Sequence, residues 1–240
     1  MRMDAARMSD AARAADTRAP DAGVKVDAAT PDAGVPDGRS DAGAGAGARI
    51  VLFDGNGLGA WVGAGGGNPR WALVEGAFEV AAGSGDIRTR QRFGDMRLHL
   101  EFRVPRTPET NGEQDRGNSG VYLQGRYEVQ ILDSFNHPLD GANDCASIYG
   151  VKDADSNEAT PAETWQTFDI VFRAARFEGA VKMQNARISV VWNGKEVQRE
   201  VEVRGPTGSG DAETAAPGAL RLQEHAHPVR FRNVWVEPLP

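Results

Sequence analysis

The chain has 240 residues, of which 40% are hydrophobic and 25% charged, a composition typical of a globular protein. Its formal net charge of −7 argues against a nucleic-acid-binding surface, which needs a basic stripe to neutralise phosphates. We also expect no transmembrane segment, because no run of about 18 apolar residues occurs.

The chain has a single cysteine, Cys145, so a disulfide within the chain is excluded. We expect a buried thiol at this position rather than a nucleophile.

The first 48 residues differ in composition from the rest. A Pro-Asp-Ala-Gly unit begins at Pro20 and again at Pro31, and Leu, Ile, Phe, Trp and Tyr are absent before Ile50. Such a segment buries too little apolar area to offset its chain entropy, so residues 1–48 are predicted to form a disordered tether. Similar tethers follow the lipid-anchor cysteine of some bacterial surface lipoproteins. No apolar signal-peptide core is present. The protein is therefore expected to be cytoplasmic as written, or exported and surface-tethered if its true start lies upstream.

From residue 50 onward the pattern is that of β-structure. Short segments alternate apolar and polar residues and end in turn residues, at positions 49–55, 78–83, 95–105, 165–174, 186–203 and 218–239. Asn193-Gly194 lies between two alternating arms, which predicts a β-hairpin. Many short strands with frequent turns predict an all-β sandwich or barrel, formed by residues 49–240 as one domain.

One of these alternating stretches carries unusual polar residues. In residues 117–134, one face consists of Val121, Leu123, Tyr127, Val129 and Ile131. The other face consists of Tyr122, Gln124, Arg126, Glu128 and Gln130. A solvated strand face usually mixes Lys, Thr, Ser and Glu, whereas this one combines an aromatic ring, two amides, a guanidinium and a carboxylate. It is either an outer surface or the floor of a site.

The spacing of Glu128, Gln130 and Asp133 points to carbohydrate chemistry. It resembles the Glu-x-Asp-x-x-Glu signature of laminarinase-type glycosidases, with an amide in the middle and Asp in the last position. Those enzymes use a β-bulge to bring the last carboxylate onto the face of the first, because a bulge inserts one residue and restores parity. We therefore expect a bulge near Asp133.

A second polar pair lies near the C-terminus. Gln223 and His225 share a face of the last alternating segment, opposite Leu222. Histidine is the side chain most readily used as an acid or base near neutral pH. His225 is thus a candidate catalytic residue, the alternative being a solvated strand end before Pro228.

Six ordered blocks of the sequence resemble the 3-keto-disaccharide hydrolase family. They are LFDGNGLGAW, NSGVYLQGRYEVQILDS, NDCASIYG, WQTFDIVFRAARF, NGKEVQ and LQEHAHPVRFRNVWVEPL, and they extend from about residue 50 to residue 240. The resemblance implies a concanavalin-like jelly-roll β-sandwich with its cleft on the concave sheet. It also implies a carbohydrate partner, a glycoside first oxidised at C3 by a separate dehydrogenase.

The resemblance assigns roles to particular positions. The implied catalytic residues are Glu128, His225 and Asp133. The implied substrate-binding residues are Arg126, Gln130, Asn118, Ser119, Tyr149 and Gln223. Where family members often read Gly-Asp-Leu-Trp-Thr-Lys, this chain has Arg88 in place of the aromatic residue and Arg90 in place of the lysine.

For a 3-keto-glycoside, the expected reaction is removal of the C2 proton, β-elimination of the C1 oxygen and rehydration. His225, Glu128 and Asp133 are the predicted acid and base groups. Arg126 is predicted to stabilise the negative charge that develops on the substrate. The alternative is a divalent cation bound by Glu128, Asp133 and an amide oxygen.

Two other functions remain open at this stage. A conventional retaining glycosidase would use Glu128 and Asp133 as its two carboxylates. A non-catalytic carbohydrate-binding module would have less need of a buried carboxylate facing a histidine.

Overall fold

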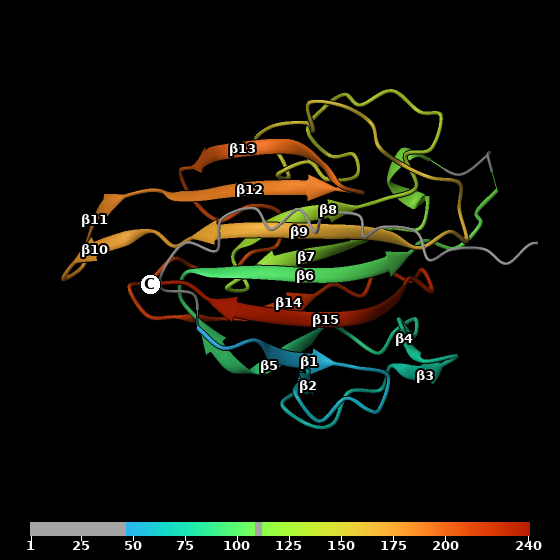
Figure 1. The fold of residues 1–240 in the computed structure, drawn as a ribbon, viewed down its shortest axis with the longest axis horizontal. Helices are drawn as coiled ribbons and strands as arrows, with labels where there is room; N and C mark the ends of the chain where they lie inside the picture. Colours follow the sequence, from blue (N-terminus) through green and yellow to red (C-terminus); the bar gives the residue numbers. More distant parts are fainter. Residues whose placement is uncertain (1–46, 109–111) are drawn as a thin grey trace, which may run out of the picture. The chain divides into compact units, whose positions relative to one another are not determined.

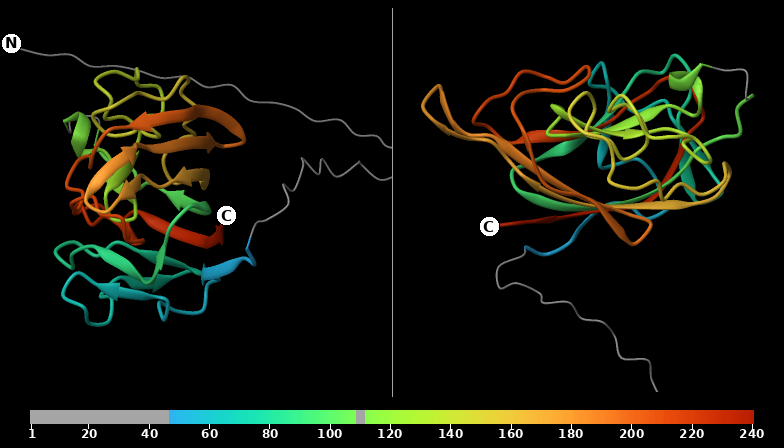
Figure 2. Two further views of the ribbon diagram at one scale, coloured as in Figure 1. Left: turned by 90° about the vertical axis from the view of Figure 1, so that its left-hand side faces the viewer. Right: turned by 90° about the horizontal axis from the view of Figure 1, so that it is seen from above.

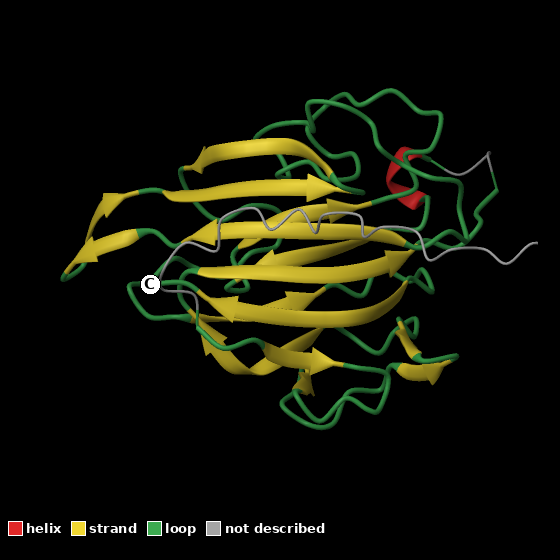
Figure 3. Ribbon diagram, viewed as in Figure 1, coloured by secondary structure: helices red, strands yellow, loops and turns green. Residues whose placement is uncertain are grey.

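A computed structural model describes residues 47–108 and 112–240. The predicted tether therefore lies almost wholly outside the described residues. The described chain consists of strands, turns and one 3-10 turn, Glu113–Asp115 (Figure 3). No helix in this part of the chain is long and apolar enough to cross a membrane.

Two antiparallel sheets form the predicted β-sandwich. The larger has eight strands in the order β13-β12-β9-β6-β15-β4-β3, with β1 paired to β15 (Figure 1). Its strands are β1 (Ile50–Phe53), β3 (Ala72–Val74), β4 (Ala77–Glu79), β6 (Met96–Arg103), β9 (Gln166–Arg173), β12 (Ala186–Trp192), β13 (Lys195–Val203) and β15 (Arg230–Pro238).

The second sheet has five strands in the order β2-β5-β14-β7-β8. Its strands are β2 (Trp61–Gly63), β5 (Ile87–Phe93), β14 (Gly218–Leu222), β7 (Ser119–Leu123) and β8 (Tyr127–Ile131). A small hairpin, β10 (Arg176–Glu178) and β11 (Val181–Gln184), extends from the larger sheet. Seen from above, the two sheets form separate layers (Figure 2).

The core lies between the layers and follows the predicted alternation. Every second residue of β6 and β9 is buried, including Phe102 and Phe168, whose ring centroids are 4.6 Å apart. Trp192 packs edge-on against Phe168. These contacts join neighbouring strands on the inner face of the larger sheet, and Tyr127 of β8 meets Phe172 of β9 across the layers with ring centroids 5.5 Å apart. The fold class predicted from the sequence is confirmed.

Two local predictions are also confirmed. Asn193 and Gly194 have φ values of 49° and 85° and connect β12 to β13, as the two central residues of a type I′ turn require. Cys145 is buried, and burial raises the pKa of its thiol to about 12. A thiol that remains protonated at neutral pH is a poor nucleophile, so Cys145 is a core residue.

Candidate functional site

The polar face recognised in the sequence forms the floor of a pocket. In the β7–β8 hairpin, Tyr122 lies opposite Glu128 and Gly120 lies opposite Gln130. The alternate residues of both strands, such as Val121 and Val129, belong to the hydrophobic core. The polar residues therefore lie on the face of the five-stranded sheet that points away from the core.

The pocket has a volume of about 360 Å³ and combines segments far apart in the sequence. Its walls come from the 3-10 turn and the residues before β7, from β7, β8 and the loop after β8, and from the loops before and after β14. It is lined by Gln114, Asn118, Tyr122, Glu128, Gln130, Tyr149, Gly208, Ser209, Gln223 and His225. The predicted residues Asn118, Glu128, Gln130, Tyr149, Gln223 and His225 are thus brought together.

Glu128 is the acid among the described residues that line this pocket, and 2% of its surface is exposed. Its Oε2 accepts a hydrogen bond from the Tyr122 hydroxyl at 2.6 Å. Two glycines make room for the carboxylate, since a Cβ atom at Gly120 or Gly208 would overlap its oxygens. The backbone N–H of Glu128 donates to Thr207 Oγ1 at 2.8 Å, which ties the strand to the loop before β14.

Burial raises the pKa of Glu128 from 4.5 to about 7, although the Tyr122 hydrogen bond and the positive charge of Arg221 act in the opposite direction. The pKa of Tyr122 is also raised, by burial and by the neighbouring Glu128 carboxylate, so its hydroxyl remains a donor. A carboxyl group with a pKa near neutrality can both take up and release a proton under physiological conditions.

Tyr122 is the centre of a hydrogen-bond network that the sequence analysis missed. Its hydroxyl lies 3.1 Å from Ser209 Oγ and accepts from Gln223 Nε2 at 3.3 Å. The guanidinium of Arg221 lies 3.6 Å from the centroid of its ring. The sequence feature that predicts the contact between Tyr122 and Glu128 is the turn centred on Gly125. This turn places the two residues opposite each other in a hairpin.

Amide groups line the remaining floor. Gln130 Nε2 donates to Gln114 Oε1 at 3.0 Å, and Asn118 Nδ2 donates to the Gln114 carbonyl at 2.8 Å. Gln223 Oε1 is buried and accepts no hydrogen bond from the described residues. A buried acceptor without a partner is costly in free energy.

His225 lies on the exposed side of the pocket. Its ring is parallel to that of His227, with the centroids 6.1 Å apart. His227 Nε2 in turn lies 2.9 Å from Asp115 Oδ1. The histidine predicted from parity is therefore at the site, but at its mouth rather than on the floor with Glu128.

Asp133 does not join this pocket, which corrects the geometric prediction. The pairing of β7 with β8 has no register shift, so the expected bulge is absent, and β8 ends at Ile131. The Asp133 carboxylate accepts from the backbone N–H of Phe135 at 3.3 Å and lines a different pocket, together with Arg116. The strand ends before its parity could return Asp133 to the polar face.

Arg126 and Ser119 also lie outside the pocket lining. The Arg126 guanidinium donates hydrogen bonds to Gln124, Thr214 and Ala216 and lines a neighbouring pocket. Ser119 Oγ donates to the Gln223 carbonyl at 2.8 Å and is fully buried. Both residues hold the segments that build the site.

A site for the divalent cation was predicted from Glu128, Asp133 and an amide oxygen. These two carboxylates line separate pockets, so they do not form a common site. Among residues 47–108 and 112–240, no cluster of three or more His, Cys, Asp or Glu side chains has the arrangement of a metal centre.

Comparison with known proteins shows the family of the chain. The model of a family described as the 3-keto-alpha-glucoside-1,2-lyase-like domain matches residues 48–237. The chain belongs to this family. The six sequence blocks indicated the same family. The matched residues include nearly all of those in the two sheets. A search of curated proteins gives no match to this lyase-like domain.

Solved structures resemble the lyase-like domain over most of its length. A protein from Parabacteroides distasonis, proposed to be a glycosyl hydrolase, is 36% identical with a TM-score of 0.74, and the match covers 80% of this chain and 84% of that one. A second such protein from the same organism is 19% identical with a TM-score of 0.58, covering 80% and 94%. The first shares both family and fold, and the second shows the fold.

The raised pKa of Glu128 has a consequence for the stability of the lyase-like domain. Because the folded-state pKa of about 7 exceeds the ordinary value of 4.5, the charged carboxylate destabilises the native state increasingly as the pH rises between these values. At about 1.4 kcal/mol per pKa unit, Glu128→Gln should stabilise the protein by about 3 kcal/mol above pH 7 and by little below pH 4.5. Urea unfolding at both pH values measures this, with the exposed Glu178→Gln as control.

Equal stability of wild type and Glu128→Gln at both pH values would contradict the raised pKa. A loss of stability at the higher pH would show that the carboxylate stabilises the native state.

Proposed function

We propose that the lyase-like domain cleaves 3-keto-glycosides, with Glu128 as the base that removes the C2 proton. The observation that carries this proposal is the buried Glu128 carboxyl on the pocket floor, with a pKa raised to about 7 and a hydrogen bond from Tyr122. Family membership and the relative proposed to be a glycosyl hydrolase support the substrate class.

The chemistry explains why a single poised carboxylate suffices for the first step. A C3 ketone makes the C2 proton acidic, because the electron pair left on C2 delocalises into the carbonyl. That pair then forms a C1–C2 double bond as the C1–O bond breaks, and the departing oxygen takes up a proton. Water finally adds its hydroxyl to C1 and a proton to C2, which completes a net hydrolysis.

The two oxygens of Glu128 are suited to different tasks. Oε2 accepts from Tyr122, while no hydrogen bond from the described residues reaches Oε1, which is therefore assigned the C2 proton. Tyr122 holds the carboxylate in position. Protonating the departing oxygen is assigned to His225, because it lies at the mouth where the leaving group would exit.

Room for that leaving group lies beside the pocket. A wider groove of about 680 Å³ shares Tyr149 and Gly208 with the pocket and continues along residues 204–207. A glycoside with its keto sugar over Glu128 could thus extend its second unit past Tyr149. Aromatic side chains offer apolar faces for such sugar contacts.

The pocket geometry disfavours the retaining glycosidase. That mechanism needs two carboxyl groups roughly 5–5.5 Å apart. Among the described residues lining the pocket, Glu128 is the sole carboxylate, since Asp133 lies elsewhere. A pure binding module could use a carboxylate to accept hydrogen bonds from sugar hydroxyls, but it has no need of a carboxyl group whose pKa is raised to about 7.

The substrate test compares a 3-keto-glucoside with the same glucoside bearing a C3 hydroxyl. The protein should cleave the first and leave the second intact. In heavy water the released 3-keto sugar should carry deuterium at C2 beyond a no-enzyme control, because rehydration takes that hydrogen from solvent. Cleavage of both glucosides at similar rates, without the label, would overturn the proposal.

The pH profile gives a separate check on Glu128. A base must be unprotonated in the free enzyme, so the ascending limb of kcat/KM for the 3-keto-glucoside should rise through about pH 7. The assigned acid must stay protonated, so kcat/KM falls again where that group loses its proton. Initial rates between about pH 5.5 and pH 8.5, at substrate concentrations well below KM, measure this. Activity that increases toward acid pH would instead indicate that protonated Glu128 acts as an acid.

A further inference from the structure

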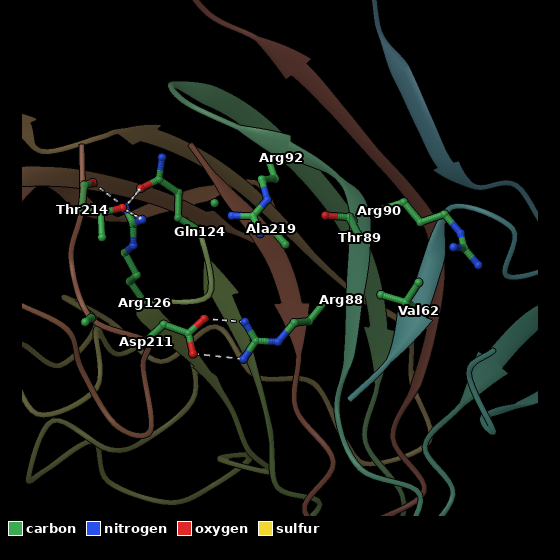
Figure 4. Close-up of a pocket in the computed structure, with 12 residues that line it drawn as sticks. Val62, Arg88, Thr89, Arg90, Arg92, Gln124, Arg126, Asp211, Thr214 and Ala219 are labelled. Atoms are coloured by element: carbon green, nitrogen blue, oxygen red, sulfur yellow. Dashed lines mark hydrogen bonds and ion pairs between the residues drawn. The ribbon is translucent and has the colours of Figure 1, made fainter. Parts of the chain in front are cut away.

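A second pocket on the five-stranded sheet is rich in arginine. Arg88, Arg90 and Arg92 all belong to β5, whose pairing with β14 shifts register between Arg88 and Arg92. Together with Arg126 and Asp211 they line a pocket of about 540 Å³ (Figure 4). Four arginines against one aspartate make this a strongly positive region in a chain whose net charge is −7.

Asp211, the acid in the lining of this pocket, forms an ion pair with one of the four arginines. Asp211 receives hydrogen bonds from both terminal nitrogens of Arg88, and this contact lowers the pKa of its carboxyl. Figure 4 shows this pair facing each other across the pocket. Arg90 lies at the edge and donates to the Gly59 carbonyl, which is uncharged.

Neither Arg126 nor Arg92 makes a hydrogen bond or ion pair with a carboxylate among the described residues, although Arg126 lies near enough to Asp211 to help lower the pKa of that carboxyl. Arg126 is 6% exposed, and its four hydrogen bonds all go to uncharged oxygens of Gln124, Thr214 and Ala216. Arg92 is exposed and makes no hydrogen bond or ion pair with the described residues. The four terminal N–H groups of Arg126 are all used in these bonds, so this residue adds positive charge to the pocket. The side-chain donors of Arg92 are unpaired and face no competing partner in the described part of the chain.

The pocket lies on the same face of the sheet as Glu128. Arg88, Arg221, Tyr122 and Glu128 are direct cross-strand neighbours in a row across β5, β14, β7 and β8. The loop between β13 and β14 contributes to both places, because Ser209 lines the Glu128 pocket while Asp211 and Thr214 line the arginine pocket.

We propose that the arginine pocket binds the anionic group of an acidic saccharide. Guanidinium groups match the paired oxygens of a carboxylate or sulfate, and the remaining lining is uncharged, with Thr89, Gln124 and Thr214. Arg92 donates hydrogen bonds to the anionic group, the buried positive charge of Arg126 attracts it, and the saccharide lies along the outer face of the sheet. This binding does not depend on cleavage at Glu128.

Calorimetric titration of the full-length protein tests this with unoxidised sugars. The probes are glucuronosyl-glucose, the neutral glucosyl-glucose, glucose 6-phosphate and inorganic sulfate. The acidic disaccharide should bind at least about ten-fold more tightly than the neutral one, since a charge-assisted hydrogen bond is worth a factor of roughly ten to a hundred. Glucose 6-phosphate distinguishes a phosphate preference from a carboxylate preference within the same anionic chemistry.

Arg92→Gln should weaken binding of the acidic disaccharide about ten-fold, and Arg92→Glu should weaken it further. Arg199→Gln removes the same charge from the exposed strand β13 and should leave binding unchanged. Equal affinity for acidic and neutral disaccharides, or an equal loss in Arg199→Gln, would overturn the proposal. Inorganic sulfate binding as tightly as the disaccharide would overturn the saccharide assignment.

Discussion

Replacing Glu128 by glutamine is expected to lower kcat/KM for a 3-keto-glucoside by roughly 10²- to 10⁴-fold, the range typical of a lost general base. Glutamine can still accept the Tyr122 hydrogen bond through its Oε1, so the pocket should keep its shape. It cannot take up the C2 proton. Initial rates of glycoside cleavage on purified variants measure the loss.

The matched control is Glu178→Gln, which makes the same change on the exposed strand β10. It should retain wild-type activity. Circular dichroism and the urea midpoint establish that Glu128→Gln is folded. Full activity of a folded Glu128→Gln variant would show that another group removes the proton, and His225→Ala would then be the next variant to examine.

Gly120→Ala is expected to cost roughly 10²-fold in activity, because misplacing a catalytic group by about 1 Å can have that effect. The added Cβ would overlap Glu128 Oε1, and the Glu128 Cδ and Cγ atoms lie 3.1 and 3.2 Å from its position. The backbone at Gly120 does not have the positive φ that disfavours alanine. The effect should therefore come from displacement of the carboxylate rather than from backbone strain.

Gly94→Ala is the control for this variant, since a Cβ there meets no atom within 4 Å. It should be fully active. The double variant Gly120→Ala with Glu128→Asp removes one methylene and relieves the overlap, so some activity should return relative to Gly120→Ala. Unchanged activity in Gly120→Ala would show that Glu128 needs no fixed position.

The sequence predicted those features of the site that depend on strand periodicity. Glu128 and Gln130 share parity on one strand, as do Gln223 and His225 on another segment, and the structure places all four in one pocket. The Asn193-Gly194 turn was predictable because its positive φ values demand these residue types. Local rules of this kind hold without knowledge of the tertiary structure.

The missed features depend on where strands end and on what covers them. The prediction for Asp133 assumed that β8 continues through a bulge, whereas the strand ends at Ile131. Ser209 belongs to a loop without periodicity, so its position over Tyr122 could not be derived from the sequence. The sequence placed Tyr122 on the polar face, but its hydrogen bond to Glu128 depends on the pairing of β7 with β8.

The most direct test of the account is the isotope effect at C2. A 3-keto-glucoside carrying deuterium at C2 is compared with its protiated form in ordinary water, with kcat/KM measured for each under identical conditions. If Glu128 removes this hydrogen in the rate-determining step, the deuterated substrate should react more slowly, and the released sugar should contain hydrogen at C2. Equal rates together with full retention of deuterium in the product would contradict proton abstraction at C2 and with it the proposed reaction.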